Sequence, residues 1–151
     1  MSETYIRVGT EDFDVTQELK RINRRSECGA VASFLGVVRN ANDGDQVYAM
    51  ELEHYPAMTE KALAGIVAKA RSRWSLGDVT VIHRVGRLLP GEQIVLVLVA
   101  SAHRQEAFAA CEFIMDWLKT EAPFWKKEDT PQGARWVDAR DSDDAAKARW
   151  A

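Results

Sequence analysis

The feature that most constrains the fold is the segment 93–100, QIVLVLVA, which is almost wholly apolar. Successive side chains of a strand point to opposite faces, so a strand of this kind must be covered on both sides of its sheet. We therefore expect it to lie at the centre of a sheet. The segment 79–85, VTVIHRV, comes before it, and the intervening Pro90-Gly91 pair favours a turn. The two segments are predicted to form a hairpin.

A second hairpin is predicted upstream of the first. Residues 29–38 are small and apolar, which indicates a buried strand, and residues 46–54 alternate apolar with polar side chains. The Asp43-Gly44 pair lies between them and favours a turn. We therefore expect these two strands to pair as a hairpin with a longer loop. Shorter strands are expected at 4–8 and 135–139.

The longest predicted helix follows the central strand directly. Ser101 is a suitable N-cap for it, and Pro123 ends it after Glu121 because proline disfavours helical geometry in the residue before it. Its predicted apolar face comprises Ala107, Phe108, Cys111, Ile114, Met115 and Leu118. Three further helices are predicted over 15–23 with Asp14 as cap, over 57–73 after Pro56, and over 143–150.

Strands that arrive in hairpins, with helices between them, are typical of an α+β protein. We expect a largely antiparallel sheet with flanking helices. The chain has 151 residues, which suits one domain over residues 1–151.

Composition excludes several classes of function. The formal net charge is -3, whereas nucleic-acid binders usually carry an excess of Lys and Arg. The two cysteines and three histidines have no metal-ligand spacing, so we expect no metal site and no bound cofactor. No apolar run reaches the ~18 residues needed to span a bilayer, and the N-terminal residues have no signal-peptide core. We expect a reduced protein of the cytoplasm.

Two lysines stand out on either side of Pro123. Lys119 lies at the edge of the predicted apolar helix face, where a lysine can cover apolar surface with its methylenes and place its ammonium at a cleft rim. If the chain folds back after Pro123, Lys126 can approach Lys119. A lysine beside a second ammonium and apolar walls can act as a nucleophile or general base, and two charged lysines can clamp an anion. These residues alone leave both roles open.

Other cations lie where predicted elements end. Ser101-Ala102-His103-Arg104 falls where a strand turns into a helix, and helix N-termini bind anions. A simple helix cap followed by solvated side chains explains the same residues equally well. Arg39 follows the strand at 29–38, and Arg140 lies in the polar tail, where its sequence context indicates only surface. The pattern as a whole suits a small anion that carries a phosphate.

Five longer stretches make the interpretation more specific. They are RN at 39–40, LEHYPAMTEKAL at 52–63, VIHRVGRLLPGE at 81–92, SAHRQEAF at 101–108 and MDWLKTEAPFWKKE at 115–128. In this order, over nearly the whole chain, they resemble the large subunit of molybdopterin synthase, the MoaE family. The resemblance implies an α/β hammerhead fold and a central homodimer. Each large subunit would bind one small ubiquitin-like subunit of the MoaD type.

The resemblance also implies an activity. The small subunit would carry a C-terminal Gly-Gly thiocarboxylate into a pocket of the large subunit. Two sulfurs would pass to cyclic pyranopterin monophosphate (precursor Z), its cyclic phosphate would open, and the dithiolene of molybdopterin would form. No cysteine nucleophile is then needed in the large subunit. The alternative is a non-catalytic docking module for a ubiquitin-like tail.

The resemblance assigns roles to particular residues. Lys119 matches the catalytic lysine of the family, and Lys126 matches its partner. The residues that match phosphate-holding positions are Arg39, His103, Arg104 and Arg140. Phe34 and Met115 match pocket-lining positions, and Phe124 and Trp125 are expected to help wall the channel. Some of these residues are expected to reach the pocket from a neighbouring large subunit.

Overall fold

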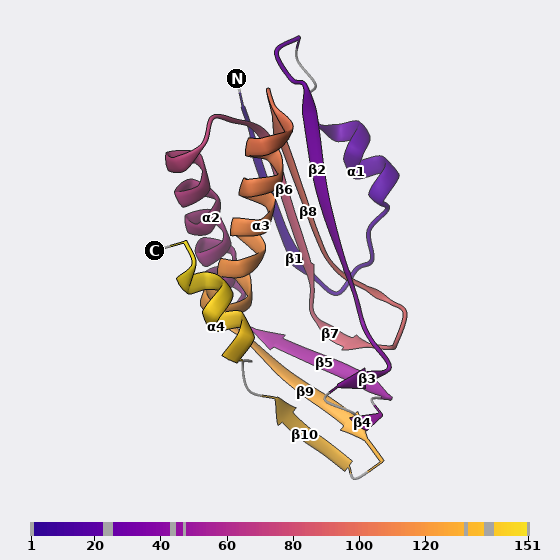
Figure 1. Ribbon diagram of the computed structural model, residues 1–151. Coiled ribbons are helices and arrows are strands. Elements are labelled where there is room, and N and C mark those ends of the chain that lie inside the picture. Colours follow the sequence, from indigo (N-terminus) through magenta and orange to yellow (C-terminus); the bar gives the residue numbers. More distant parts are fainter. Residues whose placement is uncertain are drawn as a thin grey trace.

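The computed structural model describes residues 2–22, 26–42, 45–46, 48–131, 133–137 and 141–150. Its larger sheet contains β1 (Thr4–Gly9), β6 (Leu76–Arg84), β8 (Gln93–Ser101) and β2 (Ala30–Val37), in that spatial order. β1 runs parallel to β6, and the other two pairs are antiparallel. In Figure 1, α2 (Pro56–Arg73) and α3 (Arg104–Glu121) lie on one side of this sheet and α1 (Val15–Arg21) lies on the other.

The apolar strand β8 is central, as predicted, and both of its faces are buried. Val95, Val97 and Val99 belong to the hydrophobic cluster formed with α2 and α3. Leu96 and Leu98 point the other way, into the cluster formed with α1. Because each face of β8 has its own helical cover, every position of the strand can be apolar.

The predicted hairpin of β6 and β8 is confirmed. The two strands pair with Val81 opposite Val97. Gly91 in the intervening turn has φ +90°, a conformation that glycine adopts without steric cost, and its N–H donates to the carbonyl of Val38 at 2.8 Å. This contact ties the turn to the end of β2.

A smaller antiparallel sheet lies at one end of the larger one (Figure 1). It contains β10 (Gly133–Val137), β9 (Phe124–Thr130), β5 (Ala49–His54) and β7 (Gly86–Leu88), in that order. Val38, Met50 and Leu88 belong to a third hydrophobic cluster, which joins this sheet to the end of β2. A two-residue pair, β3 (Ala41–Asn42) with β4 (Asp45–Gln46), precedes β5, and α4 (Asp141–Ala148) packs on α3.

The prediction that the strands at 29–38 and 46–54 form one hairpin is wrong. β2 pairs with β8, whereas β5 pairs with β7 and β9 in the other sheet. Asp43 and Gly44, on which the turn prediction rested, lie outside the described residues. The prediction that 29–38 is a buried strand is also wrong for its second half. β2 is an edge strand, and Phe34, Leu35 and Val37 are 40%, 42% and 45% exposed.

Helix boundaries are mostly confirmed, with two corrections on α3. Asp14 caps α1 by accepting from the N–H of Gln17, and α2 begins at Pro56. Ser101 does not cap α3: it ends β8, and its hydroxyl contacts the carbonyl of Ser75 and the carboxylate of Glu106. Phe108 does not belong to the buried face of α3, because it is 65% exposed.

The longest strand that the sequence did not predict, β9, lies in the C-terminal third of the chain. β9, FWKKEDT, carries mostly polar residues and has no apolar alternation to mark it. Its partner β10 begins at Gly133 rather than at the predicted residue 135, and α4 begins at Asp141 rather than at residue 143. β9 brings the chain back beside β5 after Pro123 and so completes the wall of the site described next.

Candidate functional site

A cavity of about 460 Å³ opens where the two sheets meet the C-terminal end of α3. The larger sheet supplies the second half of β2 from Phe34 onward, Ile94 and Val95 near the start of β8, and His83 near the end of β6. The smaller sheet supplies Met50, Leu52, Phe124 and Lys126. The cavity is therefore lined mainly by apolar side chains, with a few polar groups placed among them, as is usual for small-molecule sites.

Lys119 reaches the cavity from the last turn of α3. The helix ends two residues later at Glu121, Ala122 donates its N–H to the carbonyl of Leu118 at 3.4 Å, and Pro123 follows. The C-terminal end of a helix carries partial negative charge, which favours a cation in this turn. Leu118 is buried at 3% exposure while Lys119 is exposed, so the helix places an apolar wall and an ammonium side by side.

Lys126 reaches the same cavity from β9. The strand pairs with β5 so that Lys126 lies opposite Leu52, and alternation places Phe124, Lys126 and Glu128 on one face. The Lys126 Nζ lies 3.6 Å from an Oε2 of Glu128, whose side chain is only 3% exposed. This ion pair with a carboxylate on its own strand restricts where the Lys126 ammonium can lie. Residues 119 and 126 are thus brought to one pocket, as the sequence suggested.

Arg39 and Phe34 also line the cavity. Both belong to the edge strand β2 or follow it directly, and the N–H of Val38 donates to the carbonyl of Glu92 at 2.9 Å. This bond holds the end of β2 against the turn before β8. Arg39 therefore adds a third cation to the lining, and Phe34 adds an aromatic wall that is partly open to solvent.

His83 is a lining residue to which the sequence assigned no functional role. It lies near the end of β6, is 6% exposed and stacks on Phe124, with ring centroids 4.0 Å apart and planes at 21°. The pKa of His83 is lowered to about 4, mainly by burial; a hydrogen bond to the Arg84 carbonyl opposes this shift, and the nearby Lys119 and His54 add to it. The signal in the sequence was its place near the end of a strand, inside the matched stretch at 81–92.

Three of the predicted site residues lie elsewhere in the described chain. Met115 is buried in the core cluster one turn before Lys119 and is not among the residues that line the cavity. His103 and Arg104 are exposed at the N-terminal end of α3, about 22 Å along the helix axis from Lys119. Arg140 and the side chain of Trp125 lie outside the described part of the structure.

Neither cysteine lines the cavity. Cys111 is buried on α3, and burial raises the pKa of its thiol to about 11, so it stays protonated at neutral pH. Cys28 and Cys111 are both free thiols. Within the described residues, no cluster of His, Cys, Asp or Glu could hold a metal ion, and no helix is long and apolar enough to cross a membrane.

Comparison with known proteins agrees with this architecture. A family model described as "MoaE protein" matches residues 8–121. The chain belongs to the MoaE family. The molybdopterin synthase catalytic subunit of Ralstonia nicotianae is 66% identical over 146 residues, which are 96% of this chain and 83% of that relative.

Solved structures of MoaE proteins share the fold. The molybdopterin biosynthesis MoaE protein from Burkholderia ambifaria superposes with a TM-score of 0.83 at 58% identity, covering 99% of this chain and 98% of the other. Molybdopterin synthase from Staphylococcus aureus gives 0.81 at 31% identity, covering 87% and 96%. The family resemblance read from the sequence and the α+β class of the fold are both confirmed.

Proposed function

We propose that this chain is the catalytic subunit of a molybdopterin synthase. In this role it transfers two sulfurs from the thiocarboxylated C-terminus of a small ubiquitin-like subunit to precursor Z and forms the dithiolene of molybdopterin. The observation that carries the proposal is the cavity itself, where Lys119, Lys126 and Arg39 meet along a largely apolar lining. That lining contains no thiol, which fits a reaction whose sulfur arrives on a partner.

The lining divides naturally between the two substrates. The apolar wall, with Phe34, Leu52 and Phe124, suits the backbone of an extended peptide tail that must be shielded from water. The three cations suit the phosphate of precursor Z and the negative charge that develops on sulfur and oxygen during transfer. In this proposal Lys119 acts at the reacting centre, and Lys126 and Arg39 hold the anionic groups.

His103 and Arg104 fit the proposal only if a second copy of the chain supplies them. Both are exposed, and α3 carries them far from the cavity of their own chain. We propose that they complete the phosphate site of a neighbouring copy within a central homodimer. In the same proposal Arg140 helps to hold the phosphate, and Met115 supports the pocket wall from the core. With one small subunit per large subunit, the assembly is a heterotetramer.

The stoichiometry of the reaction follows from its chemistry. Each thiocarboxylate holds one sulfur. When that sulfur passes to the substrate, the C–S bond of the partner breaks, and water supplies the oxygen that turns the partner's C-terminus into a carboxylate. Two sulfurs in the product therefore consume two thiocarboxylated partner molecules. The free thiols Cys28 and Cys111 fit a reducing compartment, and we place the reaction in the cytoplasm.

The proposal is tested by incubating the protein with precursor Z in the presence and absence of thiocarboxylated partner. Molybdopterin should form only with the partner, at one product for every two thiocarboxylates consumed. Tight partner binding without any product would instead favour a docking module for a ubiquitin-like tail. Binding of precursor Z that is indifferent to the partner, again without product, would favour a ligand sensor.

A further inference from the structure

His83 differs in kind from the other polar residues of the cavity. Lys119, Lys126 and Arg39 are cations, whose side chains carry hydrogen-bond donors and no acceptor. Among the lining residues in the described part of the chain, His83 is the only side chain with a nitrogen or oxygen that can accept a hydrogen bond. The proposed function assigns this acceptor no role.

The hydrogen bond of His83 identifies which ring nitrogen is the acceptor. Nδ1 lies 2.8 Å from the backbone carbonyl oxygen of Arg84. A carbonyl can only accept, so Nδ1 carries the proton, and in the neutral ring Nε2 keeps its lone pair. With its pKa lowered to about 4 by burial, the imidazole is neutral at physiological pH. The tautomer and the charge state therefore both leave Nε2 as an acceptor.

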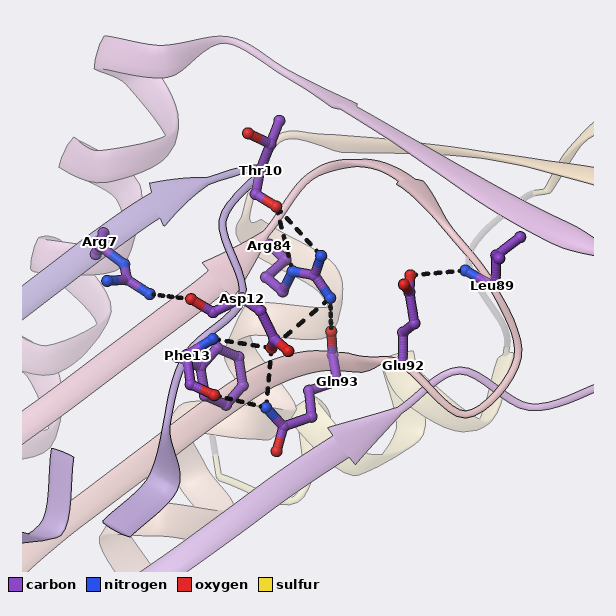
Figure 2. A network of polar contacts seen from close by, with 8 residues as sticks. All are labelled: Arg7, Thr10, Asp12, Phe13, Arg84, Leu89, Glu92 and Gln93. Carbon is purple, nitrogen blue, oxygen red and sulfur yellow. Dashed lines mark hydrogen bonds and ion pairs between the residues drawn. The ribbon is translucent and has the colours of Figure 1, made fainter. Parts of the chain in front are cut away.

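The position of the ring is fixed from two sides. The stacked Phe124 at 4.0 Å holds one face. On the other side, Figure 2 shows how the neighbouring Arg84 is held: its guanidinium donates to the carbonyls of Thr10 and Gln93, with Asp12 close by. Gln93 in turn donates to the Asp12 carboxylate at 2.9 Å. The Arg84 carbonyl belongs to the same peptide unit as the Val85 N–H, which donates to the carbonyl of Gly9 at 2.9 Å; this bond holds the peptide and so keeps Nδ1 engaged.

Other charged or titratable groups act on His83 or share its cavity. Lys119 from α3 and His54 from β5 contribute to its lowered pKa, while Lys126 from β9 and Arg39, which follows β2, line the same cavity. A protonated His83 would repel these cations, whereas a neutral ring with a free lone pair attracts an ammonium. Lys119 lines the same cavity as His83, and its positive charge is one cause of the lowered pKa of His83, so it is the donor that we assign to Nε2.

We infer that His83 is a positioning residue of this pocket, whose Nε2 accepts a hydrogen bond from the Lys119 ammonium and directs that cation towards the substrate. The pairing is proposed for the resting protein, and only its effect on turnover rests on the proposed function.

The pairing is tested by ¹⁵N NMR of the imidazole in the full chain, with the His83 signals assigned by their loss in His83→Asn. The protonated nitrogen should be Nδ1. Lys119→Met, which keeps the methylene cover but removes the charge, should raise the pKa of His83, because the charge of Lys119 lowers it. Lys127→Met is the matched control: its side chain points away from the Lys126 face of β9, and the pKa should not move. A proton on Nε2, or an unchanged pKa in Lys119→Met, would overturn the pairing.

The role in turnover is tested with two substitutions in the presence of precursor Z and thiocarboxylated partner. His83→Asn can still donate to the Arg84 carbonyl but lacks Nε2, and kcat should fall about tenfold while KM for precursor Z changes little. His83→Phe keeps a ring against Phe124 and lacks both nitrogens, and it should lose at least as much. If His83→Asn melts at a much lower temperature than the wild type, the result from His83→Phe decides the test.

The outcomes separate the inference from the proposal beneath it. An active wild type with His83 variants at the same kcat would overturn the positioning role. A wild type that makes no product would count against the proposed function, and the NMR comparison would still decide whether His83 and Lys119 are paired.

Discussion

The two sheets of this molecule are built from opposite kinds of sequence. In the larger sheet, β8 is apolar at nearly every position and both of its faces are buried by helices. In the smaller sheet, β9 reads FWKKEDT and puts a lysine and a buried glutamate on the same face. The larger sheet supplies the most completely buried strand, and the smaller sheet brings Lys126 to the cavity beside Lys119 of α3. This contrast indicates that side chains of the core and of the site can be altered separately.

The largest expected effect is on turnover. Lys119→Ala should lower product formation by about a thousandfold or more, because it removes the cation closest to the proposed reacting centre from a partly apolar pocket. The fold should survive, because the side chain is exposed at the end of α3. Activity is measured with thiocarboxylated partner, and melting temperature is the control. Turnover near the wild-type rate would contradict the role proposed for Lys119.

A matched pair of leucines compares the stability of the two sheets. Leu98 in β8 is completely buried, so Leu98→Ala should lower the free energy of unfolding by about 4 kcal/mol. Leu52 in β5 is 7% exposed and lines the open cavity, where water can fill the space, so Leu52→Ala should cost only about 2 kcal/mol. Urea denaturation measures both. Equal costs would mean that the cavity wall is packed as tightly as the centre of the larger sheet.

The same contrast explains what the sequence could predict. Apolar periodicity placed β8, its hairpin with β6 and most of the buried face of α3, because burial on a repeating pattern leaves a local signal. It failed at β9 and at the partner of β2. A polar strand has no such signal, and the partner of an edge strand depends on contacts between distant segments.

The site was predictable in part for the same reason. Lys119 and Lys126 flank a proline, and the break in the helix suggested that the chain returns on itself. His83 was missed because its environment comes from three other elements: Phe124 on β9, His54 on β5 and Lys119 on α3. None of these contacts is local in the sequence. The places of His103 and Arg104 relative to a pocket depend on a second copy and stay a prediction.

His83 belongs to the larger sheet and lines the cavity, and its buried imidazole should make the free energy of unfolding depend on pH. Its pKa is about 4 in the folded chain and 6.5 in the unfolded chain, so between these values the unfolded state binds more protons. Stability should therefore fall as pH drops from about 6.5 to about 4, with roughly 2 kcal/mol lost at pH 5. Urea denaturation at a series of pH values measures this slope. His83→Phe should flatten it, and an unchanged slope in that variant would assign the effect to other groups.

The smallest expected effect concerns Phe108, which helical spacing assigned to the core although it is 65% exposed. Phe108→Ser should change the free energy of unfolding of the isolated chain by less than about 0.5 kcal/mol, because little apolar surface is lost from the core. Phe113→Ala on the same helix is the matched control. Phe113 is 1% exposed and packs against Trp74, so this substitution should cost about 3 to 5 kcal/mol.

Phe108 lies one turn from Arg104, at the end of α3 that we propose to meet a second copy. If that proposal is right, Phe108→Ser should weaken self-association measured by light scattering even though the fold is unaffected. A large loss of stability with unchanged association would place Phe108 in the core after all.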